Sequence, residues 1–179
     1  MELIDIAKTH APDLLLVGTL LVCCYIDLRR QKIYNAVLLP AVLAAFAISY
    51  LNGGAAGCLD SLKGLLVGMA LLFLPFAVGG IGAGDVKLLG AIGAFKGPEF
   101  VLVAFLAGAV AGGAISVFLL IKQGKLLLTF KKIYYFIINK IMRIPVSLSF
   151  RNLEVAAKGE SFPYALVIGL GTMLAYILG

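Results

Sequence analysis

The sequence predicts an all-α, polytopic membrane protein with about six transmembrane helices and one basic amphipathic helix at the membrane interface. Of its 179 residues, 62% are hydrophobic and only 13% are charged. Soluble domains are about half apolar and about a quarter charged. Since a transmembrane helix needs ~20 apolar residues, the chain has room for roughly five to seven spans and little else. We therefore expect a single membrane-embedded domain over residues 1–179.

Charged residues mark the ends of six apolar runs, each expected to be a helix. The runs are 12–26, 36–51, 64–79, 86–95, 100–121 and 162–178. The first run is expected to stay in the mature protein, because Glu2, Asp5 and Lys8 do not form the basic start of a signal peptide. The fourth run is shorter than a full span, so we expect it to be thin, tilted or shielded by its neighbours.

The basic residues predict the orientation in the membrane. If the six runs alternate in direction, one side receives Lys8, Lys63 and Lys96. The other side receives Arg29, Arg30, Lys32, Lys87, Lys122, Lys125, Lys131, Lys132, Lys140, Arg143, Arg151 and Lys158. Because basic loops stay in the cytoplasm, the N-terminus is expected outside.

Residues 124–150 are predicted to form the basic amphipathic helix. Polar side chains fall near one helical face: Lys125, Thr129, Lys132, Asn139, Lys140 and Arg143. Such a helix lies on an anionic inner leaflet, which explains the net charge of +6 without nucleic acid as a partner. A seventh span over 133–142 is the competing interpretation, and the lysines that bracket so short a run argue against it.

Two acids at the ends of apolar runs carry the chemistry. Asp85 lies with Lys87 in the glycine-rich stretch GIGAGDVK at 80–87, and Asp27 ends the first run. A carboxylate at the edge of a membrane span is costly and by default functional. The six-run topology gives both acids the same depth on the cytoplasmic side. Two close carboxylates share one proton, so one can activate water while the other donates to a scissile carbonyl. This pattern predicts an aspartyl protease dyad.

Each acid also has a purely structural interpretation. Asp85 would cap a helix after a glycine turn, with Lys87 extending to lipid headgroups, and Asp27 would pair with Arg29 or Arg30. The neighbouring glycines at 82 and 84 permit positive φ and close backbone approach. Together with the glycine at 90, they would let the helices that carry the acids pack side by side.

No other catalytic or metal-binding group competes with the acids. Cys23 and Cys24 lie inside the first run, Cys58 is expected in a short loop, and His10 is expected on the opposite side. The sequence has no Cys-x-x-Cys and no Cys/His cluster with the spacing of metal ligands, so we expect no metal and no cofactor.

Residues 27–35 and 82–89 together resemble the type IV prepilin peptidases, membrane aspartyl proteases with a Gly-x-Gly-Asp signature. Residues 84–93 are similar to the second aspartate region of that family, and 159–165 to the Pro-aromatic-small element that opens its last helix. The resemblance covers 12–178. It implies that Asp27 and Asp85 are catalytic, that Gly82 and Gly84 shape the approach, and that Lys87 tunes the local field or anchors the loop.

Two departures from the family pattern bear on function. Members often place a proline where Tyr34 precedes Asn35, which weakens any role of Asn35 as a supporting residue. Larger bifunctional members carry a cytoplasmic domain with paired Cys-x-x-Cys motifs and also N-methylate the product. Only eight residues separate Asp27 from Ala36, so this chain looks like the short, peptidase-only form found with tight-adherence (Flp-type) pili, and is also similar to archaeal preflagellin peptidases.

The resemblance therefore implies an endopeptidase at the cytoplasmic face of a prokaryotic plasma membrane. Its substrate would be a prepilin-like protein with a short basic leader and a hydrophobic N-terminal helix. Because that leader and this protein's cytoplasmic face are both basic, we expect the hydrophobic helix to be what the enzyme recognises.

Two other functions stay open. One is a transporter in which the acids relay protons or bind cations, although mid-span polar residues and internal repeats, typical of transporters, are not evident. The other is a protease of the presenilin or signal-peptide-peptidase type. Those proteases carry their acids on adjacent helices late in a longer chain, whereas here the acids end the first and third runs.

Overall fold

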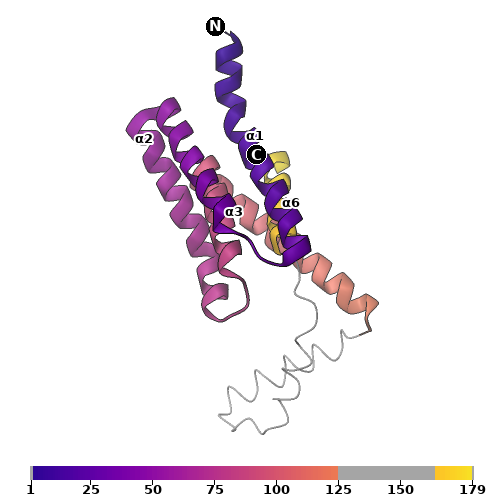
Figure 1. Cartoon of the computed structure of the whole chain (residues 1–179). Coiled ribbons are helices and arrows are strands. Elements are labelled where there is room, and N and C mark those ends of the chain that lie inside the picture. The colour runs from indigo at the N-terminus through magenta and orange to yellow at the C-terminus, as the bar shows by residue number, and fades with distance from the viewer. Residues whose placement is uncertain (1, 125–163, 179) are drawn as a thin grey trace. The chain divides into compact units, whose positions relative to one another are not determined.

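The computed structural model describes residues 2–124 and 164–178, with side chains from Ala11 onward. Its helices are α1 (Glu2–Arg30), α2 (Asn35–Ala77), α3 (Ala83–Lys122) and α6 (Tyr164–Leu178), as Figure 1 shows. The described ranges contain no strand, which confirms the all-α class. The predicted amphipathic helix lies outside the described residues, apart from the glycine at its start.

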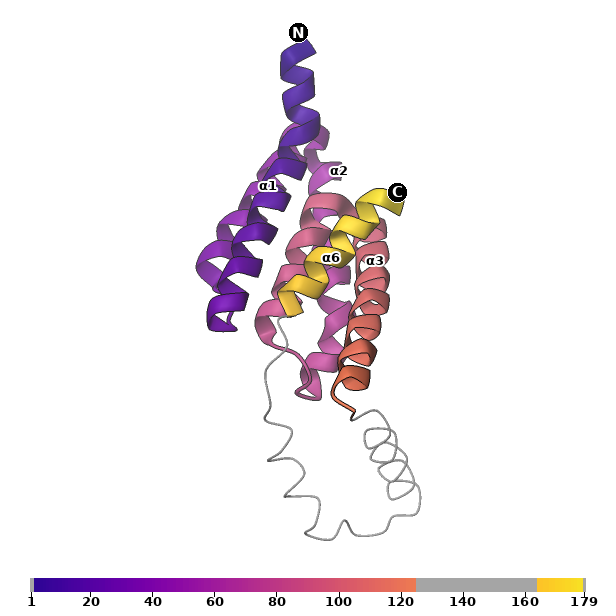
Figure 2. The same ribbon diagram turned by 90° about the vertical axis from the view of Figure 1, so that its right-hand side faces the viewer.

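Residues 1–111 and 163–179 form one compact unit, and 112–162 form a second. Of the second unit the structure describes only 112–124, the end of α3 and the two residues after it. The helix contacts that position the site lie within the first unit. In that unit α6 lies beside α1 (Figure 2).

Helix α2 turns back on itself at Gly54. This glycine has φ 58°, a left-handed conformation that side chains rarely tolerate. The Ser61 hydroxyl lies 2.6 Å from the Ser49 hydroxyl, although twelve residues of straight helix would separate them by about 18 Å. The two halves of α2 therefore run antiparallel, and the second and third predicted runs form its two legs.

Helix α3 turns back in the same way at Gly97, which has φ 85° and precedes Pro98. Before this turn, the chain runs from Asp85 to Lys96. After it, the Phe100 ring contacts Tyr176 near the end of α6, with ring centroids 5.0 Å apart. Gly108 lies further on, against the carbonyl of Val167 near the start of α6. The fourth and fifth predicted runs are therefore the two legs of α3.

Small residues let the legs of α2 and α3 approach at backbone distance. A methyl group added at Gly64 would collide with the carbonyl of Gly93, and one at Gly93 would collide with the carbonyl of Gly64. One added at Gly90 would come 2.7 Å from Cγ of Met69 in α2. Close contact through small residues is typical of helices packed in lipid. The prediction that Gly90 brings the acid-bearing helices together is wrong, because Gly90 faces α2 and not α1.

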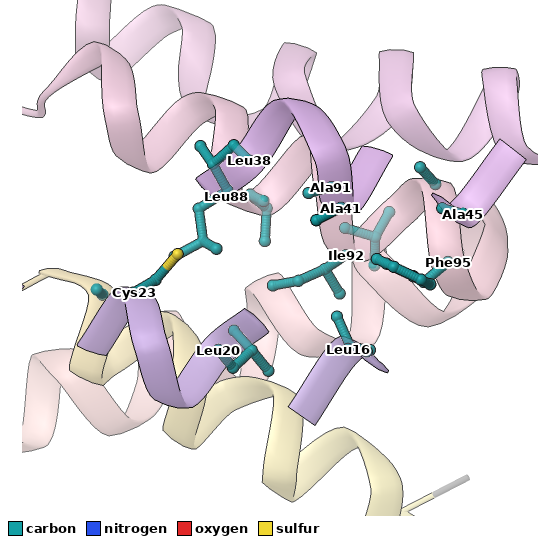
Figure 3. Packing of buried hydrophobic residues seen from close by; sticks show 14 of the residues in the cluster. Leu16, Leu20, Cys23, Leu38, Ala41, Ala45, Leu88, Ala91, Ile92 and Phe95 are labelled. Carbon is teal, nitrogen blue, oxygen red and sulfur yellow. The ribbon is translucent and has the colours of Figure 1, made fainter. Parts of the chain in front are cut away.

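A single apolar core joins α1, α2 and the first leg of α3. In α1 and the first leg of α2 the buried residues are spaced three or four apart, which places them on one helical face, whereas residues 88–95 of α3 are all buried. Figure 3 shows these side chains directed toward one another from the three helices. They are Leu16, Leu20 and Cys23 of α1, Leu38, Ala41 and Ala45 of α2, and Leu88, Ala91, Ile92 and Phe95 of α3.

Three helical segments are long and apolar enough to cross a membrane: Ala11–Arg30, Asn35–Ala77 and Ala83–Lys122. Their outward faces carry large apolar side chains, such as Leu14 at 76% exposed and Leu74 at 75% exposed. Apolar surface of this extent indicates contact with lipid. The protein is therefore a helical membrane protein, and six separate crossings stay a prediction. Cys58 lies inside α2 and not in a loop, because the helix restarts directly after Gly54.

Candidate active site

Asp27 lies on the buried face of α1, close to the end of the helix that is predicted to face the cytoplasm. It follows Leu16, Leu20 and Cys23 at helical spacing and is 7% exposed. Its Oδ2 atom accepts a hydrogen bond of 3.1 Å from the backbone N–H of Ala165. Ala165 lies in the first turn of α6, where N–H groups have no partner inside the helix and the helix dipole favours negative charge. The start of α6 is thus bound to the Asp27 carboxylate.

Asp85 lies on the buried face of α3, in its first turn, and is 8% exposed. It shares that face with Leu88, Ile92 and Phe95. Its Oδ2 atom accepts a hydrogen bond of 3.3 Å from the N–H of Gly82, and its own N–H donates to the Gly82 carbonyl at 3.1 Å. In a capping box, the side chain of the third helical residue accepts a hydrogen bond from the N–H of the residue just before the helix. Asp85 and Gly82 form this half of the motif. Asp85 therefore does cap α3, as the structural interpretation expected.

The two acids lie at the same end of the same core. The faces that carry them contribute Leu20 and Cys23 from α1 and Leu88 and Ile92 from α3 to one cluster. The capping role of Asp85 thus leaves it at the same end of the core as Asp27.

The alternative interpretation of Asp27, an ion pair with Arg29 or Arg30, does not agree with the structure. Among the described residues, the ion pairs join Lys96 to Asp13 and Lys63 to Asp60. The Arg29 guanidinium lies over the Tyr25 ring, 5.2 Å from its centroid, and Arg30 donates to the Tyr34 hydroxyl at 3.4 Å. Asp27 is therefore buried beside a helix N-terminus instead of neutralised by an arginine.

The two signature glycines act through close contact. A Cβ on Gly84 would lie 2.8 Å from Cβ of Ile33, so this glycine lets the segment after α1 close against the start of α3. A Cβ on Gly82 would lie 3.1 Å from Oδ2 of Asp85, so this glycine leaves room for the carboxylate. Neither glycine uses the positive φ that it permits, since the described glycines with positive φ are at 54, 79, 97 and 124.

Lys87 and Asn35 lie together beside the acids. The Lys87 ammonium donates a hydrogen bond of 2.9 Å to Oδ1 of Asn35, the first residue of α2. Lys87 lies in the second turn of α3 and not in the preceding loop. The bond joins α2 to α3 at the end of the fold where Asp85 lies, so both predicted supporting residues are near the candidate site.

Two parts of the site escaped sequence reasoning. The N–H of Ala165 is a backbone group, so no residue type marks it, although the resemblance at 159–165 did indicate a helix start there. In the sequence, Ile33 is an ordinary apolar residue of a predicted loop. Only its contact with Gly84 shows that it packs against the start of α3. In the described ranges, no three His, Cys, Asp or Glu side chains gather as a metal site would require.

The fold and the site together define the class of protein. It is a membrane protein with bent helices and two buried carboxylates at one end of its core. A model of the type IV leader peptidase family matches residues 14–117, which include both acids. Since that match covers more than half of the chain, the protein belongs to the type IV leader peptidase family.

A curated relative agrees with this family. The chain is 27% identical over 175 residues to the prepilin leader peptidase/N-methyltransferase of Bacillus subtilis (strain 168). The alignment covers 94% of this chain and 56% of that relative, so the chain spans about half the relative's length. No solved structure matches the chain.

Proposed function

We propose that this protein is an aspartic endopeptidase that removes the leader peptide of prepilin-like substrates, with Asp27 and Asp85 as its catalytic pair. The observation that carries the proposal is the burial of both acids on facing helices at one end of one core. Membership of the type IV leader peptidase family supports the same activity.

The surroundings of the two carboxylates suit general acid–base chemistry. Asp27 accepts a hydrogen bond from a buried N–H at the start of α6. An ionised acid takes a proton from the attacking water, and its protonated neighbour donates to the carbonyl oxygen of the scissile bond. The acid that took the proton from water then donates it to the amide nitrogen as the C–N bond breaks, and the other acid takes back its proton as the new carboxyl group forms. Water and the two acids therefore suffice, without a metal or cofactor.

The proposed site faces the cytoplasm. Of the described basic residues, Arg29, Arg30, Lys32 and Lys87 lie toward the acid-bearing end of the core. Lys63 and Lys96 lie toward the opposite end, near the Gly54 and Gly97 turns. This asymmetry supports an N-terminus outside a prokaryotic plasma membrane, with six crossings made by α1, the legs of α2 and α3, and α6. It also supports an anionic inner leaflet as the lipid partner.

The proposed substrate is a prepilin-like protein of the Flp or preflagellin type, with a hydrophobic N-terminal helix that enters the bilayer. The exposed basic residues at the active end would repel a basic leader, so the hydrophobic helix supplies the binding energy. We also propose that the chain acts only as a peptidase. Helix α1 ends at Arg30 and α2 begins at Asn35, so the four residues 31–34 that join them are too few for an inserted methyltransferase domain.

Substitution of each acid tests the proposal directly. Asp27→Asn and Asp85→Asn keep the shape of the side chain but cannot exchange a proton in the same way. We expect each to reduce leader cleavage by about a thousandfold or more, and the double variant to lose little beyond either single one, because members of one catalytic unit fail together. The measurement is product mass after incubation of purified protein with prepilin in detergent.

Asp60→Asn is the matched control, since Asp60 is an exposed acid in α2 paired with Lys63. It should leave cleavage unchanged. Gel filtration and thermal unfolding in detergent would establish that all variants fold. Substantial cleavage by folded Asp27→Asn or Asp85→Asn protein would overturn the assignment.

A further inference from the structure

A second polar cluster lies at the end of the core opposite the acids. The Lys96 ammonium binds Oδ1 of Asp13 at 2.8 Å, and the Tyr176 hydroxyl donates to the same oxygen at 2.8 Å. Lys96 also lies over two rings, 5.3 Å from the centroid of Phe100 and 4.7 Å from that of Tyr176. We call these four residues the distal cluster.

The distal cluster joins the same three helices as the candidate active site. Asp13 and Asp27 belong to α1, Lys96 and Asp85 to α3, and Tyr176 to α6, whose first turn donates to Asp27. The helical rise places the cluster about 21 Å from the site along α1 and about 17 Å along α3. Helices α1 and α6 are thus bonded to each other at both ends of the core, whereas α3 is bonded to α1 at the distal end and, through Lys87, to Asn35 of α2 at the other.

The chemistry of the distal cluster makes it a well-defined contact. The side chains of Lys96 and Asp13 are only 24% and 33% exposed, whereas those of Lys63 and Asp60 are 66% and 70% exposed. A pair shielded from water is screened less than an exposed one. The two aromatic rings attract the ammonium group further, and the single Asp13 oxygen that accepts two donors favours one geometry.

Close packing of small residues and interhelical hydrogen bonds together define how far one helix slides along another in lipid. We propose that Asp13, Lys96 and Tyr176 are positioning residues that set the axial register of α1, α3 and α6, and so align Asp27 with Asp85. This inference rests on the proposed function only for its effect on catalysis, since the register itself is a property of the fold.

A disulfide near the active site measures that register without any cleavage. Cys24, one turn before Asp27, lies with its Sγ 3.3 Å from where a Cβ on Gly169 would be. This is close to the separation inside a disulfide. In a Cys23→Ala, Cys58→Ala background, Gly169→Cys should therefore crosslink α1 to α6 through Cys24 under mild oxidation.

We expect Lys96→Met, Asp13→Asn and Tyr176→Phe each to slow this crosslink at least threefold in protein that still folds. The same changes, made in the native cysteine background, should lower kcat for leader cleavage by about tenfold and leave KM nearly unchanged, because the substrate-binding surface is not altered. Lys96→Arg keeps the ion pair and the stacking on the rings, so it should restore most of both values.

Lys63→Met is the matched control, because it removes the exposed ion pair of α2 and should change neither measurement. The proposal is overturned if folded Lys96→Met protein crosslinks at the unmodified rate, or if Gly169→Cys does not crosslink to Cys24 at all. If the variants slow crosslinking as expected but the unmodified protein does not cleave prepilin, the proposal on helix register stands. In that case the peptidase assignment is rejected.

Discussion

The carboxylate of Asp27 accepts a hydrogen bond from the backbone N–H of Ala165, a residue 138 positions further along the chain. This bond connects the end of α1 to the start of α6. It gives a buried acid a hydrogen-bond donor that is not a cation. The contact links a residue of the family-matched segment to the last helix, which lies beyond that segment.

Removal of the Ala165 N–H should impair catalysis without breaking α6. Ala165→Pro deletes this donor, and no intrahelical bond is lost because the first N–H groups of a helix have none. A hydrogen bond to a charged group is worth about 1.5–3 kcal/mol. We therefore expect cleavage to fall by about tenfold to a hundredfold, measured as kcat/KM in detergent.

Leu166→Pro is the control for that variant. It places the same ring in the same turn and also removes an N–H without an intrahelical partner, but one that does not bind Asp27. An equal loss of activity in both variants would mean that the proline ring, and not the missing donor, is responsible.

The contact between Gly84 and Ile33 predicts a suppressor pair. Gly84→Ala puts a Cβ 2.8 Å from Cβ of Ile33, which forces α3 and the segment after α1 apart. Overpacking of this kind costs about 1–3 kcal/mol, and here it displaces the two acids relative to each other. We expect cleavage to fall about tenfold, and Ile33→Gly, which removes the opposing Cβ, to recover part of the loss in the double variant.

Gly18→Ala provides the comparison for the suppressor pair, because a Cβ at this position of α1 meets nothing within 4 Å. It should leave activity and unfolding temperature close to those of the unmodified protein. If Gly84→Ala behaved in the same way as Gly18→Ala, close packing at Gly84 would not be required.

Loss of the Lys87–Asn35 hydrogen bond should have a smaller effect than loss of either acid. The bond is exposed, and such bonds contribute about 0.5–1.5 kcal/mol. We expect Lys87→Met and Asn35→Ala each to lower kcat/KM by about two- to tenfold. If the two side chains act through one another, the double variant will lose no more than the worse single variant. Lys32→Met, at an exposed lysine before α2, should not lower kcat/KM.

Cleavage should need neither a metal nor a methyl donor. The proposed chemistry uses two carboxylates and water, and the described residues bring no three potential metal ligands together. We expect full activity in EDTA and an unmethylated product when purified protein and prepilin are incubated with S-adenosylmethionine, as read by product mass. Loss of cleavage in EDTA, or a product heavier by one methyl group, would contradict this prediction.

The sequence by itself determined the helical membrane class and the positions of both acids. Apolar runs bounded by charges predict helices because unpaired backbone groups are too costly in lipid. Asp27 and Asp85 stand out because carboxylates are rare at the ends of such runs. The resemblance to the type IV prepilin peptidases indicated the glycines around Asp85 and predicted Lys87 and Asn35 as supporting residues.

Only the tertiary structure decided which groups these residues meet. The apolar pattern does not reveal that Gly84 meets Ile33, that Gly90 faces α2, or that Asp27 binds the Ala165 N–H. The apolar pattern also does not reveal that Asp13, Lys96 and Tyr176 meet, although Asp13 and Tyr176 are 163 positions apart in the chain. The reason is physical: hydropathy depends on each residue's own side chain, whereas a contact depends on how helices pack after Gly54 and Gly97 reverse the chain. Partners in space are therefore properties of the packed helices and not of any single run.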